Sequence, residues 1–162
     1  MNDSWKTIET DLLLIGGGVA GCMAAIEAQE AGLDVVVCEK GKVLDHTGSV
    51  GCGVDQYLTI MESGPEWDTP EFLINHLQDL TDGIVDMAVS SKVIREMPKV
   101  LKKIESFGVD FKDPVTKEYY RLRSFGLPAT YHINFDGTDF KKMIGQQVRR
   151  GQATVLMRTM GV

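Results

Sequence analysis

The chain has 162 residues, of which 43% are hydrophobic and 25% are charged, and its formal net charge is -6 at pH 7. This composition is that of an ordinary globular protein with room for one domain. The acidic balance, without a basic patch, argues against partners such as nucleic acid or a membrane surface. The longest apolar run, LLLI, is far too short to span a bilayer, so no direct membrane insertion is expected.

The three cysteines, Cys22, Cys38 and Cys52, form no CxxC pair and have no histidine-rich neighbour. A zinc or iron–sulfur site within this chain is therefore not expected, and no metal ligand is predicted. An odd number of cysteines without a secretory segment is typical of a reducing compartment. We therefore predict a cytoplasmic location.

The N-terminal quarter of the chain predicts a complete βαβ unit. Residues 11–15 are mostly apolar and predict a strand buried on both faces, and the valine-rich residues 33–38 predict a second strand. Residues 19–31 are rich in alanine and predict a helix, which Gly32 ends. Two parallel strands joined by a helix form a right-handed crossover. The predicted fold class is therefore α/β, Rossmann-like, with a mainly parallel sheet.

The middle of the chain predicts a helical excursion over about residues 65–108. It follows a glycine-rich, irregular stretch at residues 41–64, and a loop of that length is more often functional than idle. Thr69 and Pro70 predict the start of the first of two amphipathic helices. The apolar stripes predicted to face the core are Leu73, Leu77, Leu80, Ile84 and Met87, then Val93, Met97, Val100, Leu101 and Ile104.

The last third of the chain predicts a β-hairpin and then a helix and a strand. An Asp-Pro turn between aromatic residues indicates a hairpin within about residues 109–136, and the alternation in TYHINF indicates a strand at its end. Residues 137–151 predict an amphipathic helix with Phe140, Met143, Ile144 and Val148 inward, and residues 153–157 predict a strand. All these elements are assigned to one domain, residues 9–162, with no second complete domain.

A glycine-rich turn follows the first predicted strand. Gly16, Gly18 and Gly21 form G-x-G-x-x-G, in which the first glycine permits a tight turn, the second lets the backbone approach a pyrophosphate, and the third lets the helix lie close. The amide groups and positive dipole end at the start of the helix suit phosphates. Glu39 ends the second strand, where a carboxylate accepts hydrogen bonds from an adenosine ribose and disfavours a 2′-phosphate. The motif predicts a site for FAD or NAD, not NADP.

The stretch DLLLIGGGVAGCMAAIEAQEAGLDVVVCEKG resembles the N-terminal FAD-binding segment of flavoproteins related to succinate dehydrogenase and fumarate reductase. The order downstream is also similar: the loop HTGSVGCG, two helices ending in IESFGVDF, then a strand, a helix and a strand. Within this family, YHINFDGTDFKKMIGQQVRRG is most similar to the alpha subunit of adenylylsulfate reductase. The resemblance favours FAD. An NAD-binding module is disfavoured, because the long loop after Glu39 has no obvious use there.

The resemblance implies which residues hold the FAD. The glycine turn would cradle the pyrophosphate, Glu39 would accept from the ribose beside Lys40, and the following loop would pass along the ribitol and the flavin ring. The implied cofactor-binding residues are Gly16, Gly17, Gly18, Val19, Ala20, Gly21, Glu39, Lys40, His46, Thr47, Gly48, Ser49, Gly51, Cys52 and Gly53.

His46 leaves the mode of FAD attachment open. Membrane-bound succinate dehydrogenases and fumarate reductases carry a His-Thr pair whose histidine bonds covalently to the flavin, and His46-Thr47 superposes on that pair. The stretch TGSVGCG also superposes on the corresponding loop of adenylylsulfate reductase, which binds FAD without a covalent bond. Both modes remain open at this point.

Family members continue far beyond this length, and their later regions supply the substrate-binding groups and complete the flavin pocket. The chain is therefore expected to be a truncated, N-terminal FAD-binding portion of a flavin-dependent oxidoreductase, and no catalytic residue is assigned. The whole protein would pass electrons between FAD and a small anionic substrate, adenylylsulfate or a dicarboxylate such as fumarate. The implied partner is an iron–sulfur electron-transfer subunit. The alternative is a non-catalytic, truncated dinucleotide-binding fragment.

Overall fold

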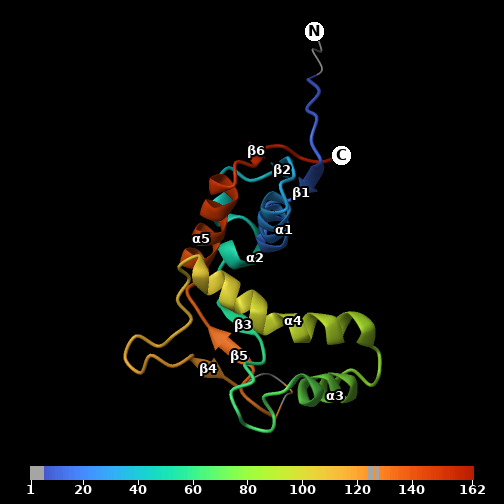
Figure 1. Ribbon diagram of the computed structural model, residues 1–162, viewed down its shortest axis with the longest axis vertical. Coiled ribbons are helices and arrows are strands. Elements are labelled where there is room, and N and C mark those ends of the chain that lie inside the picture. The colour runs from blue at the N-terminus through green and yellow to red at the C-terminus, as the bar shows by residue number, and fades with distance from the viewer. Residues whose placement is uncertain (1–5, 124–125, 127) are drawn as a thin grey trace. The chain divides into compact units, whose positions relative to one another are not determined.

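The computed structural model describes residues 6–123, 126 and 128–162 (Figure 1). The chain divides into two compact units. Unit 1 comprises Met1–Val54 and Gly137–Val162, and unit 2 comprises Asp55–Asp136. The single domain predicted for residues 9–162 stays a prediction.

Unit 1 is built on a parallel three-stranded sheet of the order β1-β2-β6. The strands are β1 (Leu12–Ile15), β2 (Val35–Glu39) and β6 (Thr154–Met157). β2 lies in the middle and pairs in parallel with both neighbours. The predicted α/β fold with a parallel sheet is confirmed, including the strand after the last helix.

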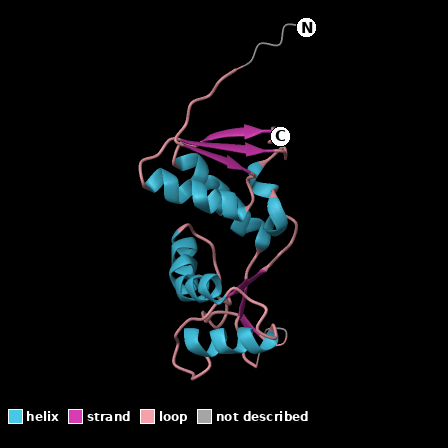
Figure 2. Cartoon of the chain, turned by 90° about the vertical axis from the view of Figure 1, so that its right-hand side faces the viewer, coloured by secondary structure: helices cyan, strands magenta, loops and turns pink. Residues whose placement is uncertain are grey.

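Helices cover one face of this sheet (Figure 2). α1 (Val19–Glu30) connects β1 to β2 and buries the small side chains of Cys22 and Ala25, so that it lies close to the strands. It ends as predicted before Gly32, whose φ of +81° is a backbone conformation that glycine adopts readily. α5 (Gly137–Arg150) leads into β6 and buries Phe140, Ile144 and Val148, as predicted.

The opposite face of the parallel sheet is open in the part of the chain that the structure describes. Leu13 is 53% exposed and Ile15 is 70% exposed, whereas Leu12 and Leu14, which alternate with them along β1, are half-buried. The prediction of a first strand buried on both faces is therefore wrong for these residues. The reason is that α1 and α5 both pack on the same side of the sheet, which leaves alternate side chains of β1 uncovered.

The segment after β2 is more ordered than the sequence indicates. It contains a 3₁₀ turn, η1 (Leu44–His46), a short helix, α2 (Gly48–Gly51), and strand β3 (Gln56–Leu58), which begins unit 2. The prediction of an irregular stretch over residues 41–64 is wrong for these elements. Elements of three or four residues are too short to show a hydrophobic period, so the sequence does not reveal them.

Unit 2 combines two helices with an antiparallel sheet of the order β3-β5-β4. Its further elements are α3 (Pro70–Leu80), α4 (Met87–Ser106), β4 (Arg121–Leu122) and β5 (His132–Asn134). An isolated antiparallel bridge between Lys112 and Tyr119 supports the predicted hairpin. The part of the predicted hairpin at residues 124, 125 and 127 lies outside the described residues.

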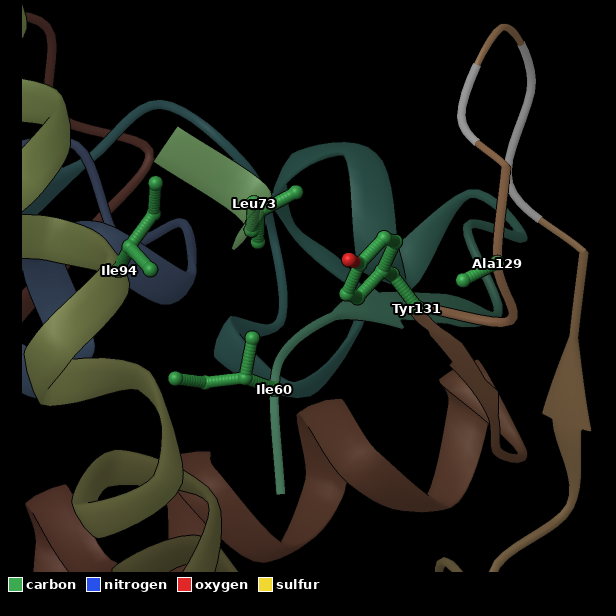
Figure 3. Packing of buried hydrophobic residues seen from close by; sticks show 5 residues of the cluster. All are labelled: Ile60, Leu73, Ile94, Ala129 and Tyr131. Atoms are coloured by element: carbon green, nitrogen blue, oxygen red, sulfur yellow. The ribbon is translucent and has the colours of Figure 1, made fainter. Parts of the chain in front are cut away.

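The core of unit 2 gathers side chains from both helices and from the strand region. Figure 3 shows a buried cluster formed by Ile60, Leu73, Ile94, Ala129 and Tyr131. The Thr69 hydroxyl accepts a hydrogen bond from the amide of Phe72 at 3.3 Å, so the predicted N-cap of α3 is confirmed. This cap fixes the start of the helix that brings Leu73 into the core.

Three residues of the predicted apolar stripes, Leu80, Ile84 and Val93, lie outside the core, and Leu80 is 51% exposed. α3 ends at Leu80, because Asp82 and Gly83 adopt positive φ angles of 48° and 76°, and Ile84 in the following turn is 87% exposed. In α4, Val93 is 49% exposed and the buried residue is its neighbour Ile94. The spacing by three and four continues through the turn without a helix to support it, so this part of the prediction is wrong.

A buried ionic cluster ties the β3–α3 connection of unit 2 to β4. The Asp68 carboxylate is fully buried and accepts hydrogen bonds from the amides of Met61 at 2.8 Å and Ser63 at 2.9 Å. Arg121 donates to both of its oxygens, at 3.1 and 3.2 Å, and lies over the Trp67 ring at 4.7 Å. Burial disfavours the ionised form of Asp68, but the hydrogen bonds from Arg121, Ser63 and the amides outweigh it and lower the pKa to about 2.

Candidate dinucleotide-binding site

The N-terminus of α1 is open to a ligand. Gly18 is its N-cap, no side chain caps it, and its first turn contains no acidic residue. The first amide groups of a helix have no partner within the helix, and together with the helix dipole they attract an anion. The predicted helix after the glycine turn therefore presents the groups that bind phosphate in such sites.

The glycines of the turn serve two different purposes. A Cβ atom on Gly21 would collide with the carbonyl oxygen of Gly16, so the fold alone excludes any side chain at this position. A Cβ atom on Gly18 would lie 3.8 Å from the Cα of Gly48, which is an ordinary contact. The fold thus leaves room for a side chain at Gly18, and the predicted approach of a pyrophosphate to the backbone there stays a prediction.

The substitution Gly18→Ala is expected to lower the affinity for ADP about tenfold or more and to leave the melting temperature unchanged, because the new methyl group makes only an ordinary contact with Gly48 and would stand where the phosphates are predicted. Titration calorimetry and thermal unfolding measure the two quantities. As a control, Gly21→Ala is expected to destabilise the fold by about 3 kcal/mol through overpacking. Unchanged ADP affinity in Gly18→Ala would contradict the predicted position of the phosphates.

The carboxylate of Glu39 holds the glycine turn in place. Glu39 ends β2 and is 6% exposed, and its two oxygens accept hydrogen bonds from the amides of Gly17 and Gly41, both at 2.6 Å. An ionised carboxylate has about four acceptor positions, so it can still accept hydrogen bonds from ribose hydroxyls. Glu39 thus shapes the turn and keeps acceptor positions for the predicted contact with a ribose.

A cavity of about 230 Å³ lies at the carboxyl ends of the strands. Its lining residues are Ile15, Gly16, Cys38, Glu39, Lys40, Thr159, Met160 and Gly161. The amide of Thr159 donates to the carbonyl of Glu39 at 3.0 Å, which places the segment after β6 against the end of β2. Apolar walls with one carboxylate are suited to an adenosine.

Residues 159–161 also line this cavity and were not predicted as site residues. They follow β6, and residues that follow parallel strands meet at the same edge of the sheet as the glycine turn. That signal requires the pairing of β6 with β2, which the sequence does not state. Gly16, Glu39 and Lys40 were predicted as site residues, and the structure brings them together in the cavity.

Thr47 connects the second predicted loop to the glycine turn. Its buried hydroxyl lies 2.7 Å from the carbonyl oxygen of Gly17 and 2.9 Å from that of Leu44, and it donates its hydrogen to these two acceptors. Gly48 has a φ of +78°, and a Cβ atom there would lie 3.0 Å from the Cα of Gly18. The two loops therefore touch where the pyrophosphate is predicted.

The other residues predicted to contact the cofactor lie beside this site. Val19 and Ala20 form the start of α1. Gly51 packs against the backbone of His46, and the His46 side chain is exposed. None of the predicted residues on η1, α2 and the next turn lines the cavity, and those not yet placed are His46, Ser49, Gly51, Cys52 and Gly53. Their predicted contacts with the flavin stay predictions.

Among the described residues, 6–123, 126 and 128–162, no group of three or more His, Cys, Asp and Glu side chains could hold a metal ion. Within the same ranges, every helix is too short or too polar to cross a bilayer.

Comparison with known proteins gives a family match over most of the chain. The model of a family described as FAD binding domain matches residues 11–155. The chain is 42% identical over 118 residues to 4-oxocyclohex-2-ene-1-carboxylate 5-dehydrogenase of Sinomonas cyclohexanicum, which covers 72% of the chain and 20% of that protein. It is 31% identical over 106 residues to one subunit of the fumarate reductase (CoM/CoB) of Methanothermobacter marburgensis. This match covers 64% of the chain and 19% of that subunit.

Solved structures show the same fold at lower identity. The adenylylsulfate reductase of Archaeoglobus fulgidus matches with a TM-score of 0.76 and 24% identity, over 94% of this chain and 24% of that one. A quinol-fumarate reductase matches with a TM-score of 0.80 and 16% identity, over 95% of this chain and 27% of that one. The chain thus spans about a quarter or less of the length of these relatives.

Proposed function

This chain belongs to the FAD binding domain family, and from that premise we propose that it is the N-terminal FAD-binding portion of a flavin-dependent oxidoreductase. The observation that carries the proposal is the buried Glu39 carboxylate, which holds the glycine turn and at the same time lines a cavity suited to adenosine. The uncapped start of α1 follows closely after Gly16, which lines the same cavity. Together they match the polar groups of an ADP moiety.

The roles of the residues follow from this arrangement. The ribose donates to Glu39, and the pyrophosphate lies against the amides of Val19 and Ala20 at the start of α1. Gly18 and Gly48 approach each other closely, so no side chain stands between the two loops where the phosphates are proposed. FAD supplies the redox chemistry by taking up and releasing an electron pair. The residues after Thr47 extend along the flavin end in this proposal.

The proposed attachment of FAD is non-covalent. His46 is exposed on η1, and its backbone packs against Gly51. The neighbouring Thr47 is engaged with the glycine turn, so the loop is held by the protein's own hydrogen bonds. A covalent bond from His46 to the flavin remains the outcome that the test below separates.

The whole protein is proposed to pass electrons between FAD and a small anionic substrate, adenylylsulfate or a dicarboxylate such as fumarate. One relative is named as a subunit of a fumarate reductase, which supports a reductase that works with further subunits. An iron–sulfur electron-transfer subunit is the proposed partner, and the cytoplasm is the proposed location. The substrate-binding groups are assigned to the remaining length of such a protein, so no residue of this chain is given a catalytic role.

The test is a titration of the purified chain with FAD, ADP and NAD, followed by acid precipitation of the FAD-loaded sample. Binding of FAD and ADP, with the yellow colour released into the supernatant, is expected. Colour that stays in the acid pellet would indicate covalent attachment at His46. A preference for NAD would contradict the FAD proposal. Binding of ADP with no uptake of the whole FAD would favour the alternative, a non-catalytic dinucleotide-binding fragment.

A further inference from the structure

Lys141 is a feature of unit 1 that the proposed contacts with FAD do not explain. It lies on α5 and is 0% exposed, whereas the next residue, Lys142, is exposed. Lysine is rarely fully buried without a partner of opposite charge, because the interior solvates its charge poorly. A buried lysine therefore requires an explanation.

Neutral groups hold the Lys141 ammonium. Its Nζ donates to the carbonyl oxygen of Leu44 and to the Sγ of Cys22 at 3.5 Å. Burial raises the pKa of the Cys22 thiol, although the charge of Lys141 acts in the opposite direction. The protonated thiol donates in turn to the carbonyl of Gly17 at 3.2 Å. In the described part of the chain, Lys141 forms no ion pair with a carboxylate.

The charge also lies at an unfavourable place on α1. Cys22 belongs to the first turn of this helix, so the ammonium of Lys141 stands beside the positive end of the helix dipole. The first turn itself contains no acidic residue, and the two carboxylates whose charges act on Cys22 are already engaged: Glu39 by the amides of Gly17 and Gly41, and Asp45 by Arg149. Two positive contributions therefore act on the same spot, and an anion bound at the helix start would relieve both. Conflicts of this kind with local rules are expected at functional sites.

A closed ring of hydrogen bonds connects Lys141 to the glycine turn and to the loop around Thr47. Lys141 and Thr47 share the carbonyl oxygen of Leu44 as an acceptor, and Thr47 and Cys22 share that of Gly17. The ring therefore joins α5, the first turn of α1 and the segment that precedes α2. Movement of Lys141 would shift the two loops that meet at the predicted pyrophosphate.

We propose that Lys141 is a positioning residue for the pyrophosphate of the dinucleotide, and that its buried charge attracts the phosphates to the start of α1. The inference rests on the proposed dinucleotide function and assigns its phosphate affinity in part to a residue behind the glycine turn. It requires that removal of the charge lowers the affinity for ligands with phosphates and leaves the affinity for ligands without phosphates unchanged.

The experiment compares the affinities of the chain for ADP and for adenosine, by calorimetry and, for the weaker nucleoside, by chemical-shift titration. Lys141→Met is expected to bind ADP about tenfold more weakly than the unmodified chain and adenosine equally well. Lys141→Gln keeps a hydrogen-bond donor without the charge and is expected to show the same loss. Lys141→Arg keeps the charge and is expected to retain most of the affinity. Lys142→Met, on the exposed neighbour, is the matched control and is expected to bind as the unmodified chain does.

The outcomes separate this inference from the proposed function. Unchanged ADP affinity in Lys141→Met and Lys141→Gln overturns the role of the charge. A parallel loss of ADP and adenosine affinity, with a lower melting temperature, shows a purely structural role and overturns it as well. Should Lys141→Met not fold, Lys141→Gln decides by the same ratio of ADP to adenosine. An unmodified chain that binds no ADP contradicts the proposed function itself, before any variant is compared.

Discussion

Replacing Glu39 with alanine is expected to lower the free energy of unfolding by about 3 kcal/mol and to abolish ADP binding. The carboxylate accepts hydrogen bonds from two backbone amides, of Gly17 and Gly41, at 2.6 Å each, and both amides lose a charged acceptor in the variant. The ribose loses its acceptor in the same step. Urea unfolding and calorimetry with ADP measure the two effects.

Asp11→Ala is the matched control for the Glu39 variant. Asp11 also accepts a hydrogen bond from a backbone amide, that of Asp34 just before β2 at 2.9 Å, but this bond is exposed. Water replaces an exposed acceptor at little cost, so stability and ADP affinity should change little. Native ADP affinity in Glu39→Ala would contradict the position of the ribose, even if the variant proved less stable.

Replacing Asp68 with alanine is expected to destabilise unit 2 by about 4 kcal/mol, because it removes one partner of a buried ion pair. Arg121 would lose both of its hydrogen bonds to the carboxylate, and the amides of Met61 and Ser63 would lose their acceptor. Trp67 reports the change, because the guanidinium of Arg121 lies over its ring.

Urea unfolding followed by Trp67 fluorescence measures this effect. The measurement uses a Trp5→Phe background, which makes Trp67 the only tryptophan of the chain. Glu71→Ala is the control, since it removes the exposed ion pair between Glu71 and Arg95, at 2.8 Å. Its urea unfolding midpoint should equal that of the unmodified chain. An unfolding midpoint in Asp68→Ala equal to that of the control would show that the buried cluster does not stabilise unit 2.

The same carboxylate makes the effect depend on pH. The pKa of Asp68 is lowered from an ordinary value of 3.8 to about 2 in the folded chain. Ionisation of Asp68 therefore stabilises the fold fully at pH values above the pKa that the carboxyl has in the unfolded chain. This contribution, about 2 kcal/mol, is lost as the pH falls from about 4 to about 2. The stability difference between the unmodified chain and Asp68→Ala should therefore shrink over this range. A constant difference would contradict the low pKa.

Features with a local cause could be predicted from the sequence. The G-x-G-x-x-G turn leads into α1 as expected, and Thr69 caps α3, because the motif and the cap each lie within a few adjacent residues. The alternation that predicts β5 is likewise local, and it leaves Ile133 buried between two half-buried neighbours. Such patterns depend on the chain only over one turn or one strand.

Features that depend on distant pairing could not be predicted. Lys141 and Lys142 are identical residues in sequence, and only the packing of α5 against η1 and α1 decides which one is buried. Thr159 reaches the cavity only because β6 pairs with β2. Ile15 is exposed because the helices of unit 1 share one face of the sheet. In each case a partner far along the chain determines the outcome.

The division of unit 1 into two chain segments sets the order in which the site can form during synthesis. One wall of the cavity, Ile15–Lys40, leaves the ribosome early, whereas the other, Thr159–Gly161, follows only after the whole of unit 2. Until β6 has paired with β2, the nascent chain has the glycine turn without the opposite wall. Unit 2 is contiguous in the chain and emerges completely before this second wall does. In the proposed site, the nucleotide is therefore expected to bind only after residues 154–161 have emerged.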